Sequence, residues 1–268
     1  MKIKFNGKYI QSDFKNTLEF FQSVSKNEND VWIVNGFATK DNLELKENDE
    51  LFCIEKNVMP PKDALDAMMR ARHTPKLHDK LKKASVAICG LGGLGSHIGI
   101  NLARCGVGRL HIIDFDVVEP SNLNRQAYMV EDLGKFKSEA LKEQIKKINP
   151  FIEVFAEVLK IEKENISELF KDDDVVCEAF DSAKYKAILS QNFHKFYPNT
   201  PLVCGWGLAG YGDSNSIQTK KIANNFYVCG DLKNEAKVGN GLMAPRVNIC
   251  AGHQANLVLE LLVEKMDK

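Results

Sequence analysis

The fold is decided by the stretch Val86-Ala87-Ile88-Cys89-Gly90-Leu91-Gly92-Gly93-Leu94-Gly95, in which an uncharged apolar run passes directly into a glycine loop. A short apolar run of this kind is typical of a strand buried inside a sheet. A helical pattern near 96–105 follows, then a second apolar run at 110–113 that ends at Asp114. Strand, glycine loop, helix, strand and acid in this order indicate a nucleotide-binding α/β fold.

Each glycine of the loop has a physical role in this interpretation. Gly90 permits a tight turn after the strand, Gly92 and Gly93 let backbone N–H groups approach phosphate, and Gly95 allows a helix to pack closely. Asp114 is placed to accept hydrogen bonds from ribose hydroxyls. A nicotinamide-dependent dehydrogenase would share all of these features.

The rest of the chain after residue 84 continues the alternation of strands and helices. We predict strands at 86–89, 110–113, 152–155, 175–177 and 202–204, and helices near 96–105, 135–148, 162–170 and 183–196. The pattern predicts a doubly wound, Rossmann-like parallel sheet in a domain spanning 84–268. Residues 206–245 are rich in glycine and asparagine and are expected to include antiparallel strands, and 247–266 reads as a last helix.

A small separate domain is predicted at 1–57. The order strand, turn, strand, helix, strand, strand, with turns at Asn6-Gly7 and Asn35-Gly36, is that of a β-grasp fold and resembles the ubiquitin-like sulfur carrier ThiS. A carrier of that kind ends in Gly-Gly, whereas this segment ends Glu55-Lys56-Asn57 and the chain continues. We therefore expect a docking or dimer-packing module, or a structural relic. Residues 58–83 are interpreted as a linker and a polar helix.

Composition narrows the classes of function. The 268 residues are 44% hydrophobic, and 36 Lys and Arg balance 36 Asp and Glu, which argues against a broad nucleic-acid surface. The sequence contains no long apolar run, so we predict no signal peptide and no membrane span. Seven scattered cysteines without CxxC spacing fit a reducing cytoplasm and weigh against zinc.

A polar cluster after the glycine loop points to a triphosphate rather than a dinucleotide. Arg125 and Lys137 supply two cations, and Asn122 and Gln126 supply neutral donors. Cations near an α-phosphate stabilise the charge that develops as pyrophosphate leaves. Asp181 follows the strand at 175–177, where a carboxylate can hold Mg²⁺. Taken one at a time, these are also ordinary surface residues, and Asp181 could instead be a helix N-cap.

The motifs together resemble the ThiF/MoeB adenylyltransferases, relatives of ubiquitin-activating enzymes, over roughly 62–266. The segments that carry the resemblance are the glycine loop with Ser96, Asp114-Phe115-Asp116, Ser121-Asn122-Leu123-Asn124-Arg125-Gln126, Gly134-Lys135-Phe136-Lys137 and Ile148-Asn149-Pro150. The resemblance implies ATP bound by Gly93, Asp114, Asn122, Arg125 and Lys137, with Asp181 on magnesium. We expect Asp116, Ser121, Asn124 and Gln126 to belong to the same site. The resemblance also implies a homodimer in which Arg72 or Arg70 reaches the partner's ATP.

Two departures from the family pattern concern cysteine. Some family members bind zinc through paired CxxC motifs, which this sequence lacks, so we predict no zinc. Some use a cysteine in the loop before the last helix for a covalent step, but the corresponding segment 234–241 contains none. Cys204, Cys229 and Cys250 lie nearest, and we interpret them as small buried apolar residues.

These observations predict a cytoplasmic enzyme that adenylates the C-terminal carboxylate of a ThiS-type carrier, with thiamine thiazole synthesis as its pathway. Adenylation of another carboxylate, or of a tRNA base substituent, is the alternative within this chemistry. An NAD(P)-dependent oxidoreductase would leave Arg125, Lys137 and Asp181 unexplained. A non-catalytic nucleotide-binding scaffold would show no exchange of ATP with pyrophosphate.

Overall fold

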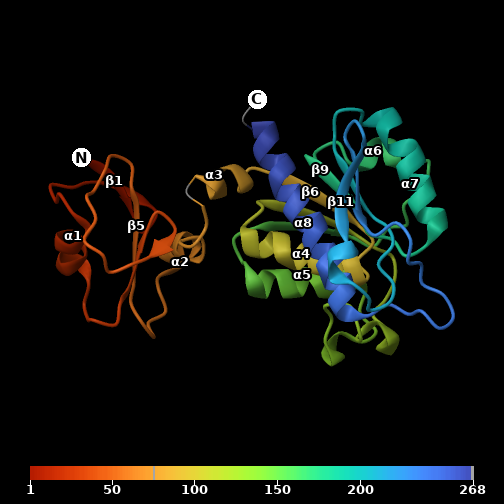
Figure 1. Ribbon diagram of the computed structural model, residues 1–268, viewed down its shortest axis with the longest axis horizontal. Coiled ribbons are helices and arrows are strands. Elements are labelled where there is room, and N and C mark those ends of the chain that lie inside the picture. Colours follow the sequence, from red (N-terminus) through yellow and green to blue (C-terminus); the bar gives the residue numbers. More distant parts are fainter. Residues whose placement is uncertain (75, 267–268) are drawn as a thin grey trace. The chain divides into compact units, whose positions relative to one another are not determined.

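A computed structural model describes residues 1–74 and 76–266 of the chain (Figure 1). Close contacts divide the chain into two compact units, Met1–Asp79 and Lys80–Lys268. The first unit holds a small sheet and the second holds the larger sheet with the glycine loop.

The first unit is a five-stranded sheet in the order β2-β1-β5-β3-β4. Its elements are β1 (Lys2–Phe5), β2 (Lys8–Gln11), α1 (Thr17–Val24), β3 (Val31–Val34), β4 (Phe37–Ala38) and β5 (Glu50–Ile54). α1 packs on one face of the sheet, where Phe21 stacks on Trp32 with ring centroids 4.8 Å apart. The predicted β-grasp order is therefore present, with the short β4 added after the Asn35-Gly36 turn.

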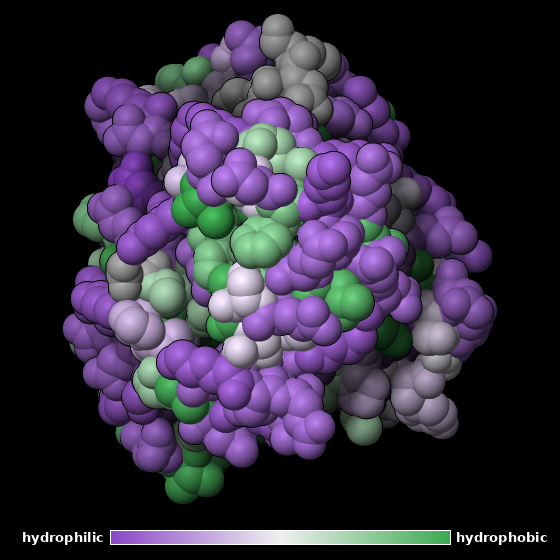
Figure 2. All heavy atoms as spheres, turned by 90° about the vertical axis from the view of Figure 1, so that its left-hand side faces the viewer, coloured by the Kyte–Doolittle hydropathy of each residue, from purple (hydrophilic) through white to green (hydrophobic). Residues whose placement is uncertain are grey.

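A second helix covers the opposite face of this sheet. α2 (Lys62–Met69) places Ala67, together with Ala71 just beyond the helix, against Ile33 and Phe52. The turn at Gly7 lies so close that a Cβ there would stand 2.5 Å from the Cβ of Ala67. On the side of this unit seen in Figure 2, the surface is mostly hydrophilic around a small apolar centre.

The polar helix predicted within 58–83 is two short helices. α2 ends at Met69, where Arg70 leaves the helical conformation, and α3 covers Leu77–Leu81. Lys76 adopts a positive φ of 67° just before α3, which interrupts any continuous helix.

The second unit is a seven-stranded sheet in the order β11-β12-β10-β9-β6-β7-β8. Its strands are β6 (Ser85–Cys89), β7 (Arg109–Ile113), β8 (Glu153–Glu157), β9 (Val175–Glu178), β10 (Leu202–Gly205), β11 (Gln218–Ala223) and β12 (Phe226–Gly230). All neighbours are parallel except β11 and β12, which form an antiparallel pair at one edge. The order around β6 is the doubly wound order that the sequence predicts.

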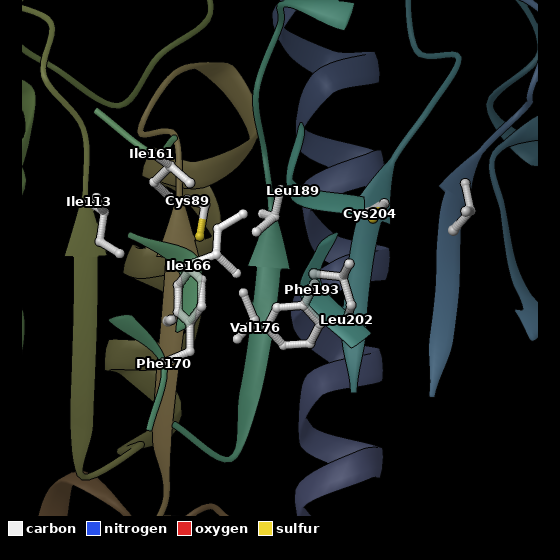
Figure 3. Close-up of a cluster of buried hydrophobic side chains, with 12 residues drawn as sticks. Cys89, Ile113, Ile161, Ile166, Phe170, Val176, Leu189, Phe193, Leu202 and Cys204 are labelled. Carbon is white, nitrogen blue, oxygen red and sulfur yellow. The ribbon is translucent and has the colours of Figure 1, made fainter. Parts of the chain in front are cut away.

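Helices cover both faces of the larger sheet (Figure 1). α4 (Gly93–Cys105), α5 (Lys137–Ile148) and α8 (Ala244–Met266) pack on one side. α6 (Ile166–Leu169) and α7 (Ala183–Phe196) cover the other, where Phe170 and Phe193 join the buried cluster of Figure 3. None of the described helices is long and apolar enough to cross a membrane.

The helix predicted at 162–170 is shorter in the structure. Asn165 accepts the Glu162 N–H and donates to the Lys160 carbonyl, so its side chain forms a turn that delays the helix until Ile166. Short 3₁₀ turns also occur at Pro120–Asn122, Val130–Asp132 and Ser214–Ser216.

Candidate active site

A cavity of about 420 Å³ opens at the carboxyl ends of β6, β7, β9 and β10, the edge where ligands bind in open α/β sheets. The order around β6 reverses here, because β7 and β9 flank it on opposite sides. Its wall includes these residues of the predicted site: Gly90, Gly92, Gly93, Asp114, Asp116, Arg125, Gln126, Lys137 and Asp181. The fold therefore brings together most of the polar groups that the motifs contain.

The glycine loop forms one end of the cavity. Gly90 has a φ of 87°, and a Cβ there would lie 2.9 Å from the ring of Phe180. α4 starts at Gly93, so its first free N–H groups and positive dipole end lie at the wall. Gly95 is not in the wall. Its Cβ would stand 1.8 Å from the Gly90 carbonyl oxygen, so this glycine lets α4 reach the strand.

Asp114 ties the loop to the end of β7. One carboxylate oxygen accepts the Leu91 N–H at 2.6 Å and the other accepts the Asp116 N–H at 2.8 Å. Burial raises the pKa of Asp114 above its usual value, although these bonds and the nearby Lys137 favour the charged form. The side chain still borders the cavity and retains lone pairs that can accept further bonds.

Two cations reach the wall with different partners. The Lys137 ammonium is buried and lies 3.0 Å from a carboxylate oxygen of Asp116. The Arg125 guanidinium donates to the Ser121 carbonyl at 3.0 Å and to the Asn124 side chain at 2.8 Å. Ser121 and Asn124 are outside the wall, so in this structure they orient Arg125.

The two amide side chains have separate places. Asn122 accepts the Glu119 N–H at 3.0 Å, closes a 3₁₀ turn and is not in the cavity wall. Gln126 is in the wall, and its buried Oε1 has no hydrogen-bond partner among the described residues. A buried acceptor without a partner is costly, so a ligand donor would be stabilising there.

His97 is a positioning residue that the sequence did not indicate. Its ring Nε2 lies 3.1 Å from the Arg125 carbonyl oxygen, which fixes the segment carrying that cation. The histidine sits one turn into α4, and only the contact reveals this role.

Asp181 projects its carboxylate at the wall on the turn between β9 and α7, and its side chain is exposed. The N-cap position of α7 belongs to Ser182. Within 1–74 and 76–266, no three His, Cys, Asp or Glu side chains are grouped closely enough to hold a metal. A lone carboxylate still fits Mg²⁺, which commonly takes one or two carboxylates and completes its shell with water and phosphate oxygens.

The other end of the cavity is apolar. Tyr185 lies between Phe115 and Phe180, with ring centroids 6.2 and 6.0 Å away, and Leu159 and Ile161 line the same wall. Phe115, Phe180, Leu159 and Ile161 follow the ends of strands, and Tyr185 lies in the first turn of α7. Their apolar character alone gave no signal in the sequence. Trp206 also lines the cavity and is half exposed, whereas Tyr211 lies outside the wall.

Two ion pairs lie next to the cavity, one partly buried and one with both side chains buried. Glu178, at the end of β9, binds the Lys186 ammonium, which also borders the cavity. Arg246 at the start of α8 pairs with Asp231, just before the wall residues Asn234 and Glu235. Burial alone would raise the pKa of Asp231, but two backbone N–H groups, Asn234 and Arg246 outweigh it and lower the pKa to about 2.

The three cysteines nearest to segment 234–241 in the sequence are buried, as expected. Cys204, Cys229 and Cys250 have little or no exposed surface, and no described cysteine lines the cavity. Burial raises the pKa of Cys229 to about 11 and that of Cys250 to about 12, so both remain neutral thiols at ordinary pH.

The arginines considered for a trans contact belong to the first unit. Arg70 pairs with Asp79 at 3.3 Å, while Arg72 is exposed. The choice between them stays a prediction.

Comparison with known proteins gives two family matches. Residues 66–268 match the model described as ThiF family, and residues 1–57 match the model described as ThiS-like ubiquitin. Both agree with the resemblances found in the sequence.

Individual relatives are similar over part of their length. The sulfur carrier protein adenylyltransferase of Thermus thermophilus is 35% identical over 126 residues, which are 45% of this chain and 46% of that protein. The tRNA threonylcarbamoyladenosine dehydratase of Bacillus subtilis is 34% identical over 147 residues, 54% of this chain and 57% of that protein. The chain thus spans less than two thirds of these relatives.

Among solved structures, the E. coli tRNA N6-threonylcarbamoyladenosine dehydratase TcdA in complex with ATP is similar in fold. The TM-score is 0.69 at 21% identity, and the match covers 78% of this chain and 99% of that one.

Proposed function

Because the chain belongs to the ThiF family, we propose that it transfers AMP from ATP to the C-terminal carboxylate of a ubiquitin-like sulfur carrier protein. The match to a sulfur carrier protein adenylyltransferase and the ThiS-like first unit support a carrier as the substrate. Thiamine thiazole synthesis is the pathway we propose for that carrier.

The observation that carries the proposal is the combination of groups around one cavity. A glycine loop at a helix N-terminus, Arg125, Lys137 and the carboxylate of Asp181 border the same space. A dehydrogenase site needs the loop and Asp114 but has no use for two cations and a second acid at the phosphate end. The unpartnered oxygen of Gln126 and the volume of about 420 Å³ are consistent with a nucleotide-sized ligand.

The chemistry follows from placing a triphosphate along this wall. The aromatic end beside Tyr185 suits a base, and Asp114 suits the ribose hydroxyls. The carrier carboxylate is already ionised at neutral pH and needs no general base. Its oxygen forms a bond to the α-phosphorus, the bond to the bridging oxygen breaks, and the electron pair leaves with pyrophosphate.

The cations of the site act on the charge that this displacement develops. Arg125 is oriented by Ser121 and Asn124 before any ligand binds, so it need not reorganise during the reaction. Lys137 is held by Asp116, which is more exposed, and a phosphate oxygen can share its ammonium. Magnesium, when held by Asp181, would neutralise phosphate charge.

We further propose a homodimer in which Arg72 of one copy approaches the nucleotide of the other. The first unit, whose chain runs on beyond residue 57, would then serve in docking or packing and not as the activated carrier.

The test is the intact mass of a ThiS-type carrier ending in Gly-Gly after incubation with the purified chain and Mg-ATP. We expect a gain of one AMP on the carrier and release of pyrophosphate. An unchanged mass, with ATP bound to the chain, would reject a sulfur carrier as the substrate while leaving the nucleotide site in place.

A second candidate is adenylation of the threonylcarbamoyl carboxylate on tRNA. The match to the Bacillus subtilis dehydratase covers more of this chain than the match to the Thermus enzyme, which favours keeping it. Exchange of labelled pyrophosphate into ATP, measured with the carrier alone and with modified tRNA alone, separates the two substrates.

A further inference from the structure

The turn that carries Asp181 is held by a partly buried ion pair, whose two residues are not among those expected to touch ATP. Glu178, only 2% exposed at the end of β9, accepts two contacts from the Lys186 ammonium, at 2.9 and 3.1 Å. The same carboxylate accepts the Phe180 N–H at 2.7 Å, immediately before Asp181. Glu178 therefore binds the turn through its backbone.

Lys186 extends this connection to the next strand. Its ammonium also donates to the Gly205 carbonyl at 2.7 Å, at the end of β10. With the two oxygens of Glu178 and this carbonyl, its three donors are all engaged. Although Lys186 borders the cavity, it is occupied by these partners and is not a free cation for phosphate.

The other side of the sheet secures the same two strands. Gln254 of α8, fully buried, donates to the carbonyl oxygens of Glu178 and Val203 at 3.2 Å each. On the cavity side, Gly90 leaves no room for a Cβ against Phe180. The backbone on either side of Asp181 is thus fixed from β6, β10, α7 and α8.

We propose that Glu178 and Lys186 are positioning residues that set the place of the Asp181 carboxylate, and hence the affinity of the nucleotide-loaded site for Mg²⁺. The inference rests on the proposed function, because it assigns Asp181 to a magnesium ion on ATP. Groups that orient a metal ligand commonly change metal affinity about 10- to 100-fold when they are removed.

The experiment compares the dissociation constant of a non-hydrolysable ATP analogue in Mg²⁺ and in EDTA by calorimetry. The dissociation constant in EDTA divided by the constant in Mg²⁺ measures the contribution of the metal. This ratio does not depend on turnover. We expect Glu178→Gln and Lys186→Met each to lower this ratio about tenfold or more, or to one.

Asp173→Asn provides a matched control at the opposite end of the same strand. Asp173 is buried just before β9 and lies 2.9 Å from a ring nitrogen of the buried His111. It does not border the cavity. It should leave the magnesium ratio at the wild-type value. A variant that does not fold is replaced by the double variant Glu178→Gln/Lys186→Met, which keeps the net charge and should also have a low ratio.

The outcomes separate this inference from the proposed function. A wild-type ratio well above one that persists in folded Glu178→Gln overturns the positioning role. A wild-type ratio of one, with ATP bound, overturns the inference but leaves nucleotide binding intact. Failure of the wild-type chain to bind the analogue at all rejects the proposed function itself.

Discussion

Arg125 is the residue whose removal should affect the reaction most directly. Its guanidinium is held by Ser121 and Asn124 beside the glycine-loop end of the cavity, where negative charge would develop in the proposed reaction. Arg125→Ala should lower the rate of ATP–pyrophosphate exchange about 100- to 1,000-fold, the usual effect of losing one preorganised donor.

The control for this variant is Arg104→Ala. Arg104 is an exposed arginine in the last turn of α4 and is absent from the cavity wall. Both variants should melt within a few degrees of the wild type. Exchange retained at the wild-type rate in Arg125→Ala would remove this residue from the site.

His111 should make stability depend on pH, away from the cavity. It lies buried on β7 between Asp173 at 2.9 Å and Glu157 at 3.1 Å. Burial alone would lower the pKa of His111, but the two carboxylates outweigh it and raise the pKa above 6.5. Its contribution to the free energy of unfolding is complete below pH 6.5 and is lost as pH rises through the raised value.

Urea unfolding at several pH values from 6 to 9 checks this for the wild type and His111→Gln. The difference in unfolding free energy between them should shrink as pH increases. A difference that stays constant over the whole range would show that the imidazole does not titrate with folding.

At the scale of elements, glycines in two helices should respond in opposite directions. Gly95→Ala would place a Cβ 1.8 Å from the Gly90 carbonyl oxygen, forcing α4 away from β6. We expect destabilisation of at least about 1–3 kcal/mol, the usual range for overpacking. Gly252→Ala in α8 meets nothing within 4 Å and should stabilise by about 0.5–1 kcal/mol.

Denaturant midpoints of the two variants provide the measurement. Gly95→Ala should also weaken ATP binding, since the first turn of α4 borders the cavity. Equal midpoints for Gly95→Ala and the wild type would mean that the close approach of helix and strand tolerates a methyl group.

At the scale of the whole molecule, the boundaries of the two family matches differ from the boundary between the two compact units. The ThiS-like match ends at residue 57 and the ThiF match begins at 66, yet α2 covers a face of the first sheet. A fragment 58–268 would therefore expose Ala67 and Ala71 to water. We expect it to aggregate, while a fragment 80–268 stays monodisperse and still binds ATP, without the trans contact proposed for Arg72.

Size-exclusion chromatography and calorimetry of the two fragments test this expectation. All residues of the cavity wall lie between Gly90 and Val247, so the shorter fragment retains every one of them. Loss of ATP binding in a folded 80–268 fragment would mean that the first unit contributes to the site.

Much of this architecture could be read from the sequence because periodicity and motif order are local signals. The strands of the larger sheet, the helix at 183–196 and the β-grasp order follow from apolar runs and turns. The start of α6 could not be predicted, since it depends on the Asn165 side chain.

The sequence motifs predicted residues that mostly border one cavity, but they did not predict which of them reach its wall. Arg125 lies in the cavity wall, whereas Ser121, Asn122 and Asn124 lie outside it. These positions depend on hydrogen bonds formed only in the folded chain. The pairs Glu178–Lys186 and Asp231–Arg246 join residues 8 and 15 positions apart, and the sequence offers many charge pairs at such separations.

The buried thiols of the second unit affect which reactive small molecules can modify the protein. Cys89, Cys177, Cys204, Cys229 and Cys250 are sealed inside the sheet and the last helix, and burial keeps them protonated. Persulfides and oxidants modify accessible thiolates, so they find little to modify among these five cysteines. In the proposed reaction, an activated carboxylate could therefore meet a sulfur donor while these five thiols stay unmodified.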